Sequence, residues 1–197
     1  MLYLHRIGVI GWLPGLFNDI WVPPAVCDEP QEGGSRGHDV PDIGRQAWLH
    51  VVNPRATPSE WLALDLGPGE LAAMALAIEN PAPVILLDDL LARRTARAAG
   101  LSAWGTLKVL LEARAQGITN EIAPLVARLD EAGLWLTDEV RRRILALAGE
   151  PESSWTTGLL APLSPRRGAA PANRPLSCYP RVAATFPAVT MRLSAPM

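Results

Sequence analysis

Residues 67–100 read GPGELAAMALAIENPAPVILLDDLLARRTARAAG, and they predict a strand between two helices. Pro68 stands near the start of a predicted helix that runs to Glu79, where asparagine and prolines end it. Val84–Leu87 is a continuous apolar run of the length expected for a strand buried on both faces. A second helix is predicted over residues 89–99, and the glycine that follows ends it. A strand between two helices is the repeating unit of an α/β fold.

The same alternation of short apolar runs and helices extends along the rest of residues 1–150. Two of the later helices begin after the predicted capping residues Asn120 and Thr137. Strands that alternate with helices predict an α/β three-layer sandwich with a central parallel sheet. The remaining predicted helices cover residues 24–29, 107–116, 120–132 and 138–148, and the remaining predicted strands cover residues 19–22 and 48–52.

Residues 151–197 differ from the rest of the chain in composition. They contain eight prolines, five arginines and a single acid, Glu152, whereas residues 1–150 contain 13 Arg and Lys against 19 Asp and Glu. No sustained period of 2 or 3.6 residues runs through them, so they are predicted to be a disordered tail after one domain of residues 1–150. Their basic charge is typical of a solvated tail, with contact to nucleic acid as the alternative.

Several other classes of protein lack support in the sequence. Cys27 and Cys178 have no CxxC spacing, which argues against a disulfide framework and against a zinc site. The apolar runs are too short to span a bilayer, and the N-terminal residues do not read as a signal peptide, so a cytoplasmic protein is expected. The chain contains no dinucleotide fingerprint, no phosphate loop and no GxSxG elbow.

Acidic residues stand at two corners of the central α/β unit. Glu70 opens one helix, and Asp88 and Asp89 follow the strand. In open α/β sheets the carboxyl ends of the strands hold ligands and metals, so acids from separate elements can converge there. Each acid also has a local explanation, because an acid in a first helical turn interacts with the helix dipole and either aspartate can cap the next helix. Glu29 lies in an acidic cluster that solvent exposure alone would explain.

Three arginines follow the aspartates on the next helix. Arg93, Arg94 and Arg97 form a basic face. A solvated helix face is the simpler interpretation, and contact with a phosphate backbone beside a metal site is the functional one.

Five segments occur in an order that carries a family resemblance. They are LHRIG, WVPPAVCDE, LGPGELAAMALA, VILLDDLLARRTARAAGL and WGTLKVLLEARAQG, within residues 1–148. This series resembles the PIN-domain proteins related to VapC-type toxins, in the branch with a GE helix and an LLDD-AR strand end. The resemblance implies a nuclease that cuts RNA with Mg²⁺ or Mn²⁺ and that is paired with an antitoxin protein.

The resemblance also assigns roles to the acidic residues. The acid that ends the VPPAV helix is Glu29, the acid of the GE helix is Glu70, and the acids after the apolar strand are Asp88 and Asp89. It implies that Glu29, Glu70 and Asp89 are catalytic and bind the metal, with Asp88 as a supporting ligand or a cap. Hard oxygen ligands of this kind suit Mg²⁺.

The N-terminal segment departs from the family pattern. Family members usually begin with a hydrophobic strand that ends in Asp, whereas residues 1–7 correspond only to the helix that follows that strand. One metal ligand and a central strand are therefore expected to be missing, which would expose two sheet edges. An in-frame upstream extension of one strand ending in Asp is expected, and a decayed gene copy is the alternative.

Two functions compete. The first is a metal-dependent endoribonuclease, and the second is a catalytically inactive PIN-like domain that binds an antitoxin or a second copy of itself. A small-molecule-binding α/β domain would need a pocket signature that the sequence lacks.

Overall fold

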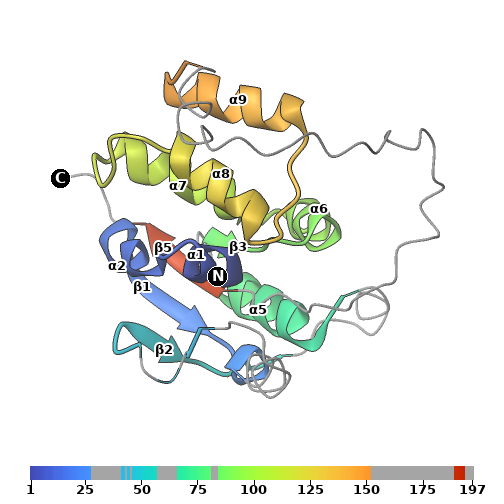
Figure 1. Cartoon of the computed structure of the whole chain (residues 1–197). Helices are drawn as coiled ribbons and strands as arrows, with labels where there is room; N and C mark the ends of the chain where they lie inside the picture. The colour runs from blue at the N-terminus through green and yellow to red at the C-terminus, as the bar shows by residue number, and fades with distance from the viewer. Residues whose placement is uncertain are drawn as a thin grey trace.

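A computed structural model describes residues 1–27, 41–42, 44, 46–56, 66–80, 84–151 and 189–193, the last range by its backbone alone. These residues form one sheet with helices packed on it (Figure 1). None of the described helices combines the length and the apolarity needed to cross a membrane. The elements are α1 (Leu2–Arg6), η1 (Ile10–Trp12), α2 (Leu13–Leu16), β1 (Phe17–Val22), β2 (Leu49–Val51), α5 (Pro68–Glu79), β3 (Val84–Leu86), α6 (Leu90–Ala98), β4 (Ser102–Trp104), α7 (Thr106–Ala115), α8 (Ala123–Glu131), α9 (Asp138–Ala148) and β5 (Val189–Leu193).

The sheet has the strand order β2-β1-β5-β3-β4. The outer pairs β1–β2 and β3–β4 are parallel, as the sequence predicts. The strand β5 is antiparallel to both of its neighbours, β1 and β3. Since β5 opposes both, β1 and β3 run in the same direction. The carboxyl ends of β1, β2, β3 and β4 therefore share one edge of the sheet, and that edge is where the acids are expected.

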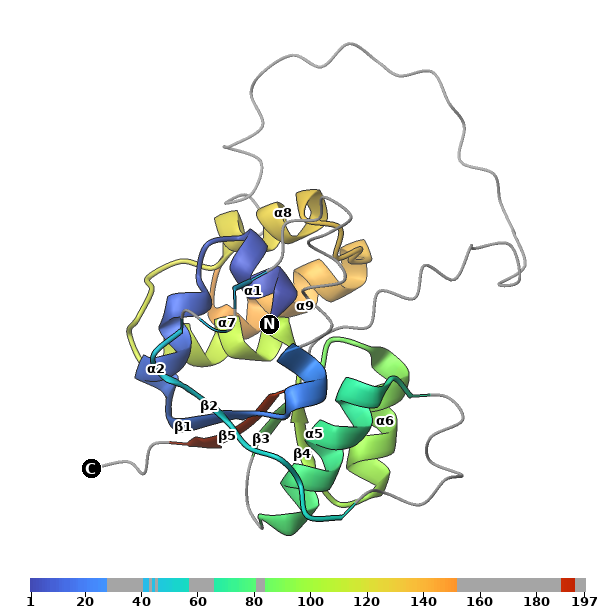
Figure 2. The same ribbon diagram turned by 90° about the horizontal axis from the view of Figure 1, so that it is seen from below.

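Two hydrophobic cores lie on opposite faces of this sheet, which confirms the α/β fold. Val84 and Leu86 of β3 point into the core formed with α1, α2, α7, α8 and α9. Ile85 and Leu87 point to the other face and pack with α5 and α6. The alternation follows from the pleat of a strand, in which successive side chains point to opposite faces. The three layers are visible from below the molecule (Figure 2).

The helices begin and end where local chemistry dictates. The helix α5 begins at Pro68, a residue tolerated at a first turn, and the helix α9 follows Thr137, whose hydroxyl accepts the N–H of Val140 at 3.3 Å. After α9, Gly149 adopts φ +70°, a conformation that a residue without a side chain takes at low cost. These bounds agree with the predicted helices.

The start of α8 corrects one predicted cap. The sequence assigns the cap to Asn120, but the helix begins at Ala123. The carboxylate of Glu150 accepts the N–H groups of Ile122 and Ala123, both at 2.8 Å. A carboxylate from beyond the next helix therefore satisfies these donors, and local sequence patterns do not reveal such a cap.

The strand β5 is the main departure from the predicted fold. Residues 189–193 belong to the segment predicted to be disordered, yet they form a strand between β1 and β3. The sheet is therefore mixed rather than wholly parallel, and β5 covers the two strand edges that the missing first strand was expected to leave exposed. Residues 152–188 and 194–197 lie outside the described part of the chain.

Candidate active site

Glu70 and Asp89 approach each other at the shared edge of the sheet. Glu70 is buried in the first turn of α5, where its Oε2 accepts the N–H of Gly67 at 3.2 Å. Burial raises the pKa of the Glu70 carboxyl, the hydrogen bond from Gly67 opposes that rise, and the negative charge of Asp89 adds to it. The structure therefore places these two carboxylates close enough to repel each other.

Asp89 is the cap of the helix α6. Its Oδ1 accepts the N–H of Ala92 at 2.8 Å, which settles which of the two aspartates performs this role. A capping carboxylate has a second oxygen. That oxygen remains available to a ligand, because one hydrogen bond to the backbone uses only part of the accepting capacity of a carboxylate.

Asp88 is held more tightly than its neighbour. Its Oδ1 accepts both the backbone N–H and the hydroxyl of Thr106, at 2.9 Å and 2.7 Å. Its Oδ2 lies 3.4 Å from the terminal ammonium of Met1, and the Asp88 side chain is 2% exposed. Asp88 therefore fixes the end of β3 against the start of α7, and its role as a supporting metal ligand stays a prediction.

Arg93 of the helix α6 holds the backbone that follows β3. Its Nη1 donates to the backbone oxygens of Leu87 and Asp88, at 2.9 Å and 2.8 Å. A side chain at Gly105 would place its Cβ 2.9 Å from that nitrogen, so the glycine leaves room for the guanidinium. Arg93 therefore uses some of its N–H donors to hold the backbone of the residues just before Asp89.

The donor set fits a divalent metal only in part. Glu70 and Asp89 supply the hard oxygen ligands that Mg²⁺ and Mn²⁺ prefer, and their mutual repulsion favours a cation between them. Within the described residues, no group of three or more His, Cys, Asp or Glu side chains is placed to hold a metal ion. Glu29, the remaining predicted ligand, lies outside the described residues.

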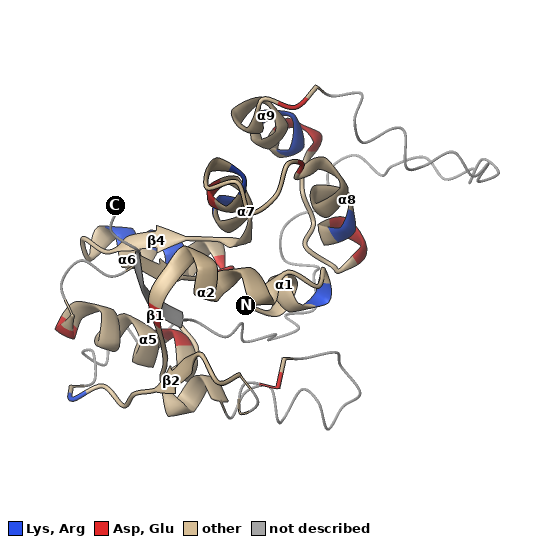
Figure 3. Ribbon diagram, turned by 90° about the vertical axis from the view of Figure 1, so that its left-hand side faces the viewer, with Lys and Arg blue, Asp and Glu red and all other residues tan. Residues whose placement is uncertain are grey.

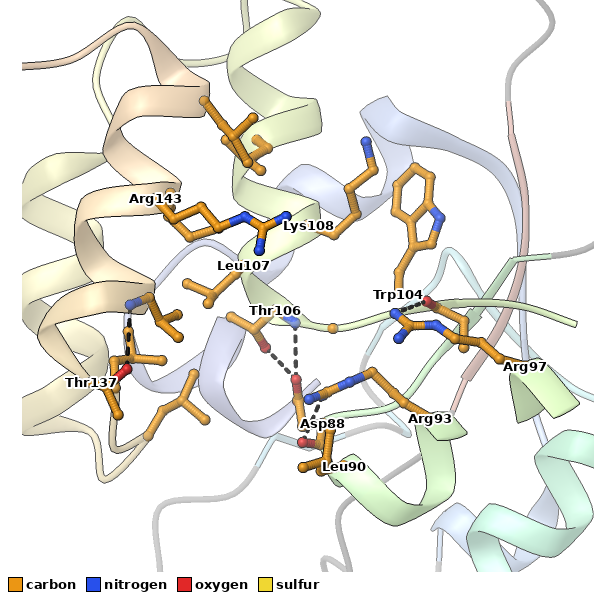
Figure 4. Close-up of a pocket in the computed structure, with 18 of the residues that line it drawn as sticks. Asp88, Leu90, Arg93, Arg97, Trp104, Thr106, Leu107, Lys108, Thr137 and Arg143 are labelled. Atoms are coloured by element: carbon orange, nitrogen blue, oxygen red, sulfur yellow. Dashed lines mark hydrogen bonds between the residues drawn. The ribbon is translucent and has the colours of Figure 1, made fainter. Parts of the chain in front are cut away.

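A groove of about 1030 Å³ opens beside Asp88 (Figure 4). Its walls come from α6, β4, α7, α9 and the loop before α9. Of the three predicted arginine contacts, Arg93 and Arg97 line the groove and Arg94 is not among the lining residues. The ammonium of Lys108 lies 4.9 Å from the centre of the Trp104 ring, where it gains a cation–π contact.

Sequence reasoning missed the contribution of β4 and of the residues that follow it. Thr106, which holds Asp88, comes two residues after Trp104, the end of β4. A strand of three residues is too short to show the alternation that marks a strand in a sequence. With β4 recognised, the parallel sheet would have placed Thr106 at the same edge as the aspartates.

The raised pKa of Glu70 predicts how stability depends on pH. In EDTA, the folded state binds the Glu70 proton more tightly than the unfolded state does, so stability should fall as pH rises from the ordinary glutamate pKa, about 4.3, through the raised value. Glu70→Gln should flatten this part of the profile, because the amide oxygen still accepts the Gly67 N–H without a charge. Urea denaturation at closely spaced pH values measures the slope, and equal slopes for parent and variant would contradict the expectation.

A comparison of the sequence with known families identifies the fold. The family model of a PIN domain, DUF3368, matches residues 1–150, which is most of the chain and includes every described element except β5. No curated protein and no solved structure matches the chain. The chain belongs to the PIN domain family.

Proposed function

We propose that this protein is an endoribonuclease that depends on a divalent metal ion. The PIN domain match supports a nuclease-type function in general. The observation that carries the more specific proposal is the pair Glu70 and Asp89, two carboxylates from separate elements close enough for the charge of one to raise the pKa of the other. Such pairs occur at functional sites.

The residues of this chain have distinct roles in the proposed site. Glu70 and Asp89 would hold Mg²⁺ or Mn²⁺, together with Glu29, whose role follows from its match to the family pattern. Asp88 orients the loop through Thr106, and Arg93 braces it through two carbonyls. The bound metal would offset charge on the scissile phosphate and make water more acidic.

The proposal extends to the partners of the protein. The likeness of the sequence to VapC-type toxins suggests a toxin that an antitoxin protein restrains and that acts on RNA in the cytosol. Self-association into a dimer is a further expectation of the same likeness.

A second candidate is a PIN-like domain that binds a partner without cutting RNA. The observation that favours it is the central strand. The segment between β1 and β3 is VTMRL, residues 189–193, and it contains no acid where the family pattern implies a strand that ends in Asp.

Cleavage of RNA separates the two candidates. The full chain is incubated with end-labelled, unpaired RNA in Mn²⁺, in Mg²⁺ and in EDTA. The nuclease proposal expects discrete cleavage products with either metal and none in EDTA. RNA that stays intact under all three conditions, with a folded protein, would support the inactive partner-binding domain instead.

A further inference from the structure

The groove beside Asp88 is positively charged in a domain that is otherwise acidic. Residues 1–150 contain 13 Arg and Lys against 19 Asp and Glu. Among the described residues that line the groove this balance reverses, since Asp88 is the one acid among them. Concave surfaces with one sign of charge attract ligands of the opposite sign. The cationic lining residues are Arg93, Arg97, Lys108 and Arg143.

The cations come from three of the helices that line the groove, α6, α7 and α9. Each of these helices carries Lys or Arg in Figure 3. Lys108 of α7 is held by Glu112, whose Oε2 lies 3.2 Å from its Nζ, and by the ring of Trp104. Arg97 of α6 donates one hydrogen bond, from Nη2 to the carbonyl of Ala103 at 3.2 Å. Arginine has five N–H donors and lysine has three, so both residues retain donors for an anion.

Arg143 is the cation with the fewest structural ties. It is exposed on α9, and its side chain makes no hydrogen bond or ion pair with the described part of the chain. Figure 4 shows its side chain extending from α9 toward α7, where Lys108 lies. Arg143 therefore faces the groove without a role in holding the fold together.

The groove also exposes large apolar side chains. Trp135 is 82% exposed and Leu147 is 65% exposed, and both line it. Of the eight large hydrophobic side chains that are exposed in the described chain, four line this groove. Scattered exposed hydrophobics are normal, whereas a group on one concave surface marks a binding site.

We propose that this groove binds an unpaired segment of the RNA substrate, an inference that rests on the proposed nuclease function. The phosphates lie against Lys108, Arg143 and the arginines of α6, and a base stacks on Trp135. Asp88 lines the groove and directly precedes the candidate ligand Asp89, so the groove adjoins the loop that carries that carboxylate.

The combination of side chains favours an unpaired strand over two other ligands. An A-form duplex keeps its bases stacked inside the helix, so it cannot place a base on an exposed indole ring, whereas single strands bind through such stacking and through cations along their backbone. An acidic protein segment would also satisfy the positive charge. It gains no base stacking on Trp135, so it should bind more weakly than RNA of equal charge.

The test measures binding separately from cleavage. In EDTA, fluorescence anisotropy follows the full chain binding to a labelled 12-nucleotide RNA, to the same RNA annealed to its complement, and to a poly-glutamate peptide. The variants are Trp135→Ala and Arg143→Gln. The matched control is Arg142→Gln, the exposed neighbour on α9 that does not line the groove. Thermal melting of each variant confirms that it folds.

The expected result is a preference for the unpaired RNA. Trp135→Ala should weaken its binding about tenfold, the effect of one lost stacking contact. Arg143→Gln should reduce the slope of log affinity against log salt by about 0.7, the effect of one lost phosphate contact. Arg142→Gln should bind as the parent does.

Three outcomes would overturn the inference. They are equal affinity for duplex and unpaired RNA, parental binding by both groove variants, and tighter binding of poly-glutamate, which would mark the groove as a site for an acidic protein segment. The cleavage assay distinguishes this failure from failure of the proposed function. If the chain with both groove substitutions cuts RNA as well as the parent does, the nuclease proposal stands and the groove proposal fails. If the chain binds unpaired RNA through the groove but does not cut it, the groove proposal stands and the nuclease proposal fails.

Discussion

A chain that ends before Val189 is expected to lose its folded sheet. The strand β5 pairs with β1 on one side and with β3 on the other, so its removal divides the sheet into two pairs of strands and leaves one edge of β1 and one edge of β3 unpaired. Each lost hydrogen bond costs roughly 0.5–1.5 kcal/mol, and the sum over both sides approaches the whole stability of a domain, about 5–15 kcal/mol. Urea denaturation followed by circular dichroism measures the loss.

Two controls separate pairing of the strand from simple shortening of the chain. A chain that ends at Leu193 retains β5 and should melt as the full chain does. Thr190→Pro should destabilise the full chain strongly, since Thr190 pairs with Trp21 and Ile85 and proline removes the N–H that a central strand needs. Thr190→Val retains that N–H and should be tolerated. Equal stability of the chains with and without β5 would show that the strand is dispensable.

Glu70→Gln and Asp89→Asn are expected to lower RNA cleavage by about a hundredfold or more. Loss of an outer partner of a metal ligand alone costs about 10–100-fold, and loss of a ligand should cost at least as much. Both substitutions preserve the local structure, because glutamine can still accept the Gly67 N–H and asparagine is a good helix cap. Initial cleavage rates in Mn²⁺ measure the effect.

The control for this comparison is Glu131→Gln on the exposed surface of α8. It removes one negative charge far along the chain from the acids and should cut RNA at the parental rate. Parental rates for Glu70→Gln and Asp89→Asn as well would remove these carboxylates from the mechanism.

Local chemistry is the part of this fold that the sequence predicts well. The helix α5 begins at Pro68 and ends at Glu79, as predicted, because a proline opens it and an asparagine with two prolines follows it. The helix α9 likewise follows the cap Thr137. The sequence also predicts that Glu70, in the first turn of α5, and Asp89, after β3, converge at the carboxyl edge of the sheet, and the charge of Asp89 does act on Glu70.

The features that the sequence hid depend on partners far away in the chain. The strand β5 is a strand because β1 and β3 offer it two edges, and its five residues lie in a proline-rich segment with no pattern of their own. The cap of α8 comes from Glu150, well beyond that helix. Arg93 was predicted to belong to a basic surface, but it turns back to two carbonyls of its own loop.

We propose that Glu70 and Asp89 together hold the divalent ion on which RNA cleavage depends. Thermal melting of the full chain and of Glu70→Gln, in EDTA and across a Mn²⁺ titration, tests this proposal. Mn²⁺ is expected to stabilise the parent by about 2.7 kcal/mol at a hundredfold excess over Kd, and to stabilise Glu70→Gln far less. A parent that gains nothing from Mn²⁺, or a variant that gains as much as the parent, would contradict it.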